Sequence, residues 1–239
     1  LDRRLSGLSF ATPLPPTAGL GIAWVSAGVT DIQGRNSAGE KTTMMQTGED
    51  ALMISFAQRI LPWFSFGANI KILQNQLPIN ESYKGSGIGF DIGFLIKSGK
   101  STTFGLMIQD INSMYNWDSG DLYAEGRIYS EYFPTIYRLG TKFIYKSIRV
   151  VADAGLITNY RVGKEVAENT FVNLSPRIGI EYTYLDLYYI RGGLGNGRIA
   201  FGWGLESDLI NDHDSRIDYT FSMDWASQLA HTFSYGFNF

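Results

Sequence analysis

Hydrophobic and polar residues alternate over most of this chain. The clearest segment is 87–96, where large apolar residues fill the even positions and glycine or aspartate fills most of the odd ones. A period of two places alternate side chains on opposite faces of a β-strand. The same pattern predicts thirteen strands and no helix, at 5–11, 19–29, 51–60, 63–73, 87–96, 103–111, 135–145, 148–158, 171–184, 187–193, 199–206, 216–224 and 231–239.

The connections between these strands alternate in length. Short turns are predicted at 12–18, 61–62, 97–101 and 146–147, and long loops fall between them at 30–50, 74–84, 112–133 and 159–170. Short turns on one side and long loops on the other are typical of an up-and-down barrel that crosses a membrane. A Greek-key sandwich has no reason to alternate in this way.

The two faces of the predicted strands differ sharply in chemistry. One is almost entirely aliphatic and aromatic, and the other carries Gly, Ser, Thr and Asn with charges of both signs. Alternation alone does not say which face is inside, because a soluble barrel buries the apolar face and a membrane barrel exposes it to lipid. The many glycines on the polar face favour a crowded inner wall. We therefore expect a lumen wall with cross-strand ion pairs, formed by Lys71, Asp91, Arg177, Glu181, Glu206 and Asp218.

The last nine residues are aromatic at nearly every second position and end on an aromatic residue, with Phe233, Tyr235, Phe237 and Phe239 on one face. This strand resembles the C-terminal targeting signal of bacterial outer-membrane β-barrels. The alternative is an ordinary core strand that happens to lie last. The resemblance implies a bacterial outer-membrane location, contact with outer-membrane lipid and recognition by the barrel-assembly machinery during biogenesis.

Composition narrows the function classes. The chain has 239 residues, 18% of them charged, and a net charge of −3, so it lacks the basic footprint of a nucleic-acid-binding protein. With no cysteine and two histidines, it offers no disulfide framework and no thiolate metal site. The glycine-rich 192–197 segment joins two strands and lacks the helix of a phosphate-binding loop. We expect no enzyme activity, no metal and no cofactor.

The chain opens at Leu1 rather than Met. We expect a signal sequence and some mature chain upstream, and a single outer-membrane barrel domain over 1–239 that is truncated at its N-terminus. The fold class is then all-β, a transmembrane antiparallel up-and-down β-barrel of about fourteen strands, since bacterial single-chain barrels have even strand numbers. A barrel of that size leaves a lumen that an upstream segment could plug.

One predicted loop, 112–133, is rich in aromatic residues. Tyr115, Trp117 and Tyr123 lie among acidic residues there, and aromatic side chains in a long outer loop are natural anchors for a partner protein. The alternatives are a rim of the aromatic girdle or packing of the loop on itself.

Several short motifs, in order, resemble the PorV/PorQ family, whose barrels are FadL-like. They are Phe10-Ala-Thr-Pro-Leu-Pro15, Gly19-Leu-Gly-Ile-Ala23, Asp31-Ile-Gln-Gly34, Phe66-Gly-Ala-Asn-Ile-Lys-Ile72, Asp91-Ile-Gly-Phe94 and Phe104-Gly-Leu-Met-Ile-Gln-Asp110. The match covers mainly 5–112, and the family's N-terminal segment with its Asn-Pro-Ala-Gly-Leu-like motif is absent from this sequence. The resemblance implies a fourteen-stranded outer-membrane barrel, with type IX secretion as the role of some members and passage of hydrophobic substrates as the role of FadL relatives.

Three hypotheses follow. The first is a non-enzymatic component of a secretion or surface-assembly complex whose long extracellular loops contact other envelope proteins. The alternative is a FadL-like transporter or channel for hydrophobic small molecules. The third is a soluble β-sandwich or barrel. None of them involves nucleic acid.

Overall fold

The computed structural model describes residues 2–78, 83–120, 124–158, 161–162, 165–166, 173–210, 213–225 and 229–237. The described residues form seventeen strands, thirteen of them long, and no helix among them is long and apolar enough to cross a membrane. The chain divides into two compact units, each described by itself below. Unit 1 is Leu1–Phe94, Met107–Tyr137 and Ile157–Val172, and unit 2 is Leu95–Leu106, Arg138–Leu156 and Asn173–Phe239.

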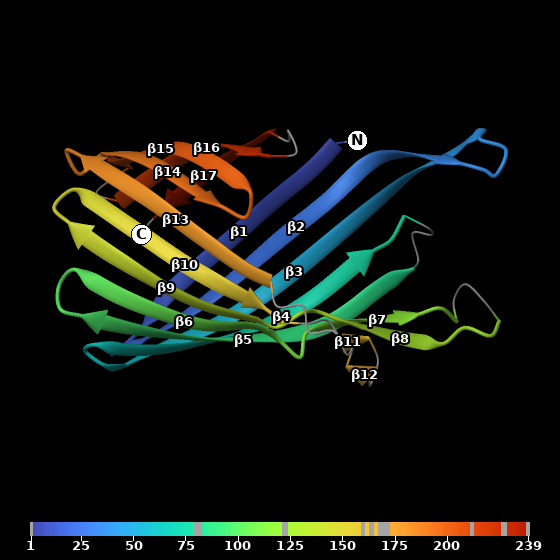
Figure 1. Ribbon diagram of the computed structural model, residues 1–239, viewed down its shortest axis with the longest axis horizontal. Coiled ribbons are helices and arrows are strands. Elements are labelled where there is room, and N and C mark those ends of the chain that lie inside the picture. The colour runs from blue at the N-terminus through green and yellow to red at the C-terminus, as the bar shows by residue number, and fades with distance from the viewer. Residues whose placement is uncertain are drawn as a thin grey trace. The chain divides into compact units, whose positions relative to one another are not determined.

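Unit 1 begins as an antiparallel meander in which each strand pairs with the next (Figure 1). Its strands are β1 (Asp2–Leu14), β2 (Ala18–Arg35), β3 (Lys41–Leu61), β4 (Phe64–Gln76) and most of β5 (Lys84–Ser98). The unit also contains half of β6 (Thr102–Ile111) and two small hairpins. These hairpins are β7 (Met114–Asp118) with β8 (Ile128–Tyr132), and β11 (Arg161–Val162) with β12 (Glu165–Val166).

Unit 2 continues the up-and-down order. β9 pairs with β6 and β10, β10 pairs with β13, and each strand from β13 to β17 is antiparallel to the next. These strands are β9 (Ile136–Tyr145), β10 (Ile148–Ile157), β13 (Asn173–Tyr184), β14 (Tyr188–Gly195), β15 (Arg198–Ile210), β16 (His213–Asp224) and β17 (Leu229–Phe237). Asn196 and Gly197 join β14 to β15 with positive φ angles of 53° and 71°, as a tight two-residue hairpin requires.

All thirteen predicted strands correspond to the long strands of the structure, but the prediction of a long loop at 30–50 is wrong. β2 extends to Arg35 and β3 begins at Lys41, so a five-residue turn connects them (Figure 1). The Asn36 side chain closes this turn by accepting hydrogen bonds from the Ala38 and Glu40 amides, at 3.0 and 2.9 Å. Because Asn36 caps the turn locally, the polar residues on either side of it can continue as paired strands.

Burial is inverted relative to a water-soluble protein. Among the described residues only three hydrophobic side chains are buried, Leu73, Tyr115 and Trp117, whereas the buried polar set is larger and consists of Lys71, Asn75, Asp91, Ser113, Ser175, Glu181 and Ser215. Long runs of Leu, Ile, Phe, Tyr and Trp on the opposite face are exposed. Exposed apolar area on this scale requires a nonaqueous environment. The structure therefore resolves the ambiguity of alternation in favour of the membrane barrel.

We predict that Ile180→Arg prevents stable insertion, because Ile180 is 53% exposed on the apolar face in the middle of β13. An arginine on the lipid face near the bilayer midplane costs about 2–4 kcal/mol. Thr183→Arg is the matched control, since Thr183 lies on the polar face of the same strand. Urea unfolding in phospholipid vesicles measures both. Equal losses, or a larger loss for Thr183→Arg, would contradict the assignment of the faces.

Candidate functional site

The polar face of unit 1 carries an uncharged strip. Strand register places four rows of residues from β1, β2 and β3 side by side on this face. The rows are Gly7, Val25 and Ala51; Ser9, Ala23 and Met53; Ala11, Gly21 and Ser55; and Pro13, Gly19 and Ala57. We call these twelve residues the small-residue strip. A hollow of about 510 Å³ is lined by residues of the second to fourth rows together with Phe10, Thr12, Leu20 and Ile22.

Beside the strip, the same face becomes charged. Lys71 of β4 bridges two carboxylates, with its Nζ 2.6 Å from Asp91 and also in contact with Asp110. Asn69 donates to Asp91 at 2.9 Å, and the Asp110 amide donates to the other Asp91 oxygen at 2.9 Å. Lys71 and Asp91 are buried. A buried cation with two anions and amide donors forms a satisfied network.

The hairpin of β7 and β8 begins by crossing the polar face of β5. A Cβ atom at Gly87 would collide with the Met114 carbonyl, and one at Gly89 would collide with the Ser113 side chain. A Cβ at Gly85 would lie 2.7 Å from the Trp117 ring. Glycine at every second position of β5 therefore lets a second segment lie directly on the strand.

Tyr115 and Trp117 of the hairpin are buried, so the expectation that loop 112–133 exposes them is wrong, whereas Tyr129 of β8 is exposed. Tyr115 is 5% and Trp117 is 4% exposed, and both pack around Leu73. Alternation within β7 directs both residues to the sheet, because they are two positions apart. The prediction that these two residues bind a partner protein assumed exposed side chains, and both side chains are buried. Tyr123 lies outside the described residues.

Carboxylates surround the hairpin's aromatic pair. Trp117 Nε1 donates to Glu131 at 3.0 Å. Burial and, to a smaller extent, the nearby charges of Glu49, Glu131 and Asp110 together raise the pKa of Tyr115 to about 12. The Tyr115 phenol is therefore neutral at physiological pH.

Unit 2 has a continuous polar network across β10, β13, β14, β15 and β16. Glu181 accepts from Arg149 at 2.7 Å and from Arg191 at 2.5 Å, and Arg191 also pairs with Asp218. Arg216 reaches Asp218 at 2.9 Å. Five side chains of alternating charge thus link four strands, β10, β13, β14 and β16.

Tyr189 extends this network. Its hydroxyl donates to Glu206 at 2.6 Å, and Arg216 stacks over its ring at 4.7 Å. Glycines beneath the arginines provide the space, since a Cβ atom at Gly204 would meet Asp218 and the Arg191 guanidinium. The arginines therefore lie flat along the sheet.

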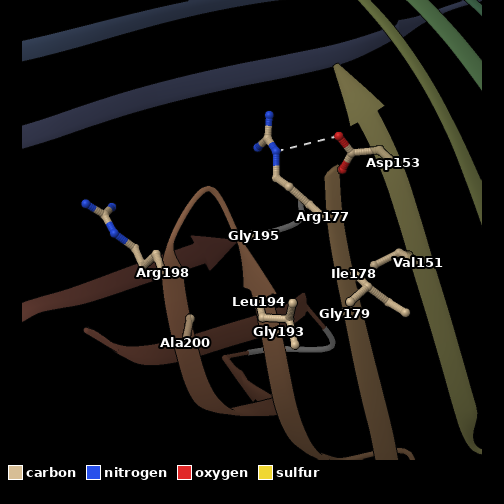
Figure 2. A pocket seen from close by; sticks show the side chains of 10 residues that line it. All are labelled: Val151, Asp153, Arg177, Ile178, Gly179, Gly193, Leu194, Gly195, Arg198 and Ala200. Atoms are coloured by element: carbon tan, nitrogen blue, oxygen red, sulfur yellow. Dashed lines mark ion pairs between the residues drawn. The ribbon is translucent and has the colours of Figure 1, made fainter. Parts of the chain in front are cut away.

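A shallow hollow of about 260 Å³ lies beside this network in unit 2 (Figure 2). Its floor is Val151, Gly179, Gly193 and Ala200, and the Arg177 and Arg198 side chains stand at its edge. Arg177 Nε lies 3.6 Å from Asp153. This half of the polar face is thus bordered by charge, whereas the small-residue strip is uncharged.

The structure places all six predicted wall residues on the polar face, namely Lys71 and Asp91 in unit 1 and Arg177, Glu181, Glu206 and Asp218 in unit 2. All six take part in ion pairs. Their role as a lumen wall stays a prediction.

In the C-terminal strand, Phe233, Tyr235 and Phe237 are exposed on the apolar face of β17, and Phe239 lies outside the described residues. The targeting role of this strand stays a prediction. Across the described part of the chain, no group of three or more histidine or acidic residues is arranged to hold a metal ion.

Sequence reasoning missed two features of this site. The small-residue strip depends on the register of three strands, which no single segment reveals. The close packing of the hairpin on β5 is indicated in the sequence by Gly85, Gly87 and Gly89, which lie at every second position of one strand. That row indicates close approach of another backbone.

Comparisons with known proteins identify the fold. No family model and no curated protein sequence matches the chain. Among solved structures, a variant of TodX, titled a monoaromatic hydrocarbon channel, superposes with a TM-score of 0.64 at 13% identity, over 98% of this chain and 83% of that one. The Ralstonia pickettii toluene transporter TbuX gives 0.63 at 12%, over 96% and 79%. A Pseudomonas aeruginosa FadL homologue gives 0.62 at 12%, over 91% and 69%.

The chain therefore has the fold of the FadL-type β-barrels, an all-β antiparallel up-and-down architecture. The FadL-like part of the sequence resemblance agrees with this fold. At these identities the likeness establishes architecture and leaves activity open.

We predict that Lys71→Met destabilises the protein by about 3–5 kcal/mol, because Asp91 and Asp110 then face each other without a cation. The triple variant Lys71→Met, Asp91→Asn, Asp110→Asn should recover most of that loss by removing the uncompensated charge. Unfolding midpoints in urea measure both. A triple variant no more stable than Lys71→Met would show that the network does not act through its charges.

We also predict that Gly87→Ala loosens the hairpin, since the new methyl group would collide with the Met114 carbonyl. Trypsin should then cut after Arg127 about tenfold faster, which corresponds to about 1.4 kcal/mol. Gly236→Ala is the matched control, because a Cβ there meets nothing within 4 Å. An unchanged rate of cleavage in Gly87→Ala would contradict the close packing of the hairpin on β5.

Proposed function

We propose that this protein is a non-enzymatic channel for small hydrophobic molecules in a bacterial outer membrane. The observation that carries the proposal is the small-residue strip, an uncharged track of twelve residues on a face whose neighbouring strands are heavily charged. A hydrophobic molecule moving along it displaces water without separating any ion pair, so it avoids the cost of breaking charged contacts.

The solved structures support the same proposal. Two of those described above are titled as a monoaromatic hydrocarbon channel and a toluene transporter. Together with the strip, they favour the hydrophobic-transport hypothesis over the secretion hypothesis. They also support an outer-membrane location, as does the exposed aromatic face of β17.

A second candidate rests on the PorV/PorQ resemblance of residues 5–112. It is a component of a type IX-like secretion or surface-assembly complex that contacts other envelope proteins. The two candidates differ in what a mild detergent extract contains. Stoichiometric envelope proteins bound to the purified barrel would favour the complex, and a solitary barrel that restores hydrocarbon uptake would favour the channel.

We predict that Ser9→Glu lowers uptake about tenfold, by placing a charge in the middle of the strip. Ser9→Gln is the matched control, because it has almost the same size without the charge and should leave most of the uptake. Radiolabelled toluene supplied to intact cells that produce equal amounts of each barrel measures the effect. Equal uptake by Ser9→Glu and the parent would rule out the strip as the path.

A further inference from the structure

We propose that three connected turns of unit 2 form a binding surface for the negatively charged head groups of phospholipids. The turns are 97–102 between β5 and β6, 145–148 between β9 and β10, and 184–188 between β13 and β14, and we call them the lysine rim. The first two lie next to each other at the left of Figure 1. This inference rests on the proposed outer-membrane location and is independent of the channel function.

Main-chain hydrogen bonds join the three turns into one surface. The Ile144 amide donates to the Ser101 carbonyl at 2.9 Å, and the Thr183 amide donates to the Ser147 carbonyl at 2.9 Å. These bonds continue the pairing of β6 with β9 and of β10 with β13. The side chains of the three turns therefore face the same stretch of membrane surface.

The lysine rim has a net positive charge on a chain that is negative overall. It carries Lys97, Lys100 and Lys146, all of them exposed, and its one acidic residue is Asp186. The whole chain, by contrast, has a net charge of −3. A negatively charged lipid surface attracts each lysine that lies close to it, so the charge of the rim is complementary to such a surface.

The three lysines differ from the cations of the polar face in how they are paired. The ion pairs between described residues of the polar face use Lys71 or an arginine as the cation. Lys97, Lys100 and Lys146 form none with the residues that the structure describes, and Lys146 Nζ lies 5.5 Å from the centroid of the Tyr145 ring. A lysine is a compact charge on a flexible chain, which suits a phosphate group that can shift its position. The rim lysines are therefore available to an external anion.

Tyrosines place the lysine rim at the level of the lipid head groups. Tyr145 ends the apolar face of β9, and Tyr184 of β13 is paired with Tyr188 of β14. The three residues are 60%, 53% and 47% exposed. Tyrosines gather at the interface between membrane and water. Because Lys146 directly follows Tyr145, its ammonium group lies beside this interface.

A lipid fits these observations better than a partner protein does. The strands that lead into the rim expose Leu139, Phe143 and Ile180 on their apolar faces, and lipid covers such faces in a membrane barrel. A head group on the rim can therefore belong to a molecule whose acyl chains cover the same strands. Short turns of outer-membrane barrels face the periplasm, where the membrane leaflet consists of phospholipids. We therefore assign the rim to anionic phospholipids, with phosphatidylglycerol as the probe.

The test removes the charge of the rim. The rim variant combines Lys97→Gln, Lys100→Gln and Lys146→Gln, none of which takes part in the ion pairs of the polar face. The matched control removes three exposed cations of unit 1 that lie outside the rim, by Lys41→Gln, Lys84→Gln and Arg127→Gln. Each barrel is reconstituted with equal amounts of phosphatidylcholine and phosphatidylglycerol. Native mass spectrometry then counts the lipids of each kind that stay bound.

We expect the parent and the control to retain phosphatidylglycerol over phosphatidylcholine by at least about tenfold, and the rim variant to lose this preference. The preference of the parent should weaken as salt is added, because the attraction is electrostatic. An equal preference in the rim variant and the parent would overturn the proposal. An equal loss in the control would also overturn it, since net charge alone would then explain the effect.

Urea unfolding in vesicles gives a second measurement. Adding phosphatidylglycerol to phosphatidylcholine vesicles should raise the unfolding midpoint of the parent and the control, because a ligand of the folded state stabilises it, and should leave that of the rim variant unchanged. No lipid preference in the parent would overturn the lysine rim and leave the channel proposal standing. An acidic envelope protein that copurifies with the parent and not with the rim variant, together with an unchanged lipid preference, would assign the rim to a protein and overturn the lipid.

Discussion

A sheet that exposes its apolar face to lipid has no hydrophobic core, so its polar face has to balance its own charges. Two cations achieve this balance. Lys71 lies between Asp91 and Asp110, and Arg191 lies between Glu181 and Asp218. Each cation meets two anions from other strands. Because an unpaired charge on a buried surface is costly, every pair also acts as a cross-strand tie. The backbone bonds between the strands and these side-chain ties together replace the packing of a core.

Glycine makes this arrangement sterically feasible. A long cation lies flat on a sheet only where the neighbouring strand has no side chain, as at Gly204 beneath Arg191. The same property lets the hairpin approach β5 at Gly87. Glycine weakens a strand through its entropy, so its frequency on the polar face reflects a requirement for space. One residue type thus serves both the charged network and the inward-folded hairpin.

The division of the unit 1 face into charged and uncharged parts links structure to function. Lys71, Asp91 and Asp110 place charges on β4, β5 and β6, whereas the twelve strip positions of β1, β2 and β3 carry only uncharged residues. Under the proposed channel function, an apolar molecule on the strip displaces water without separating an ion pair. The hairpin lies at the first row of that strip, where Ala51 and Leu73 are neighbours.

The sequence by itself determined the thirteen long strands, their faces and their up-and-down order, because side-chain alternation and turn chemistry are local properties, whereas the four short strands lie in segments predicted as loops. It also determined which charged residues lie on the polar face, since the alternation of side chains along each strand assigns Lys71 and Glu181 to that face. It did not determine which carboxylate each cation meets, because register is set by the pairing of whole strands. Nor did it place Tyr115 and Trp117, whose burial depends on a hairpin folding back onto β5. The inside-out arrangement was decided only by the tertiary structure, because alternation is unchanged when the two faces are exchanged.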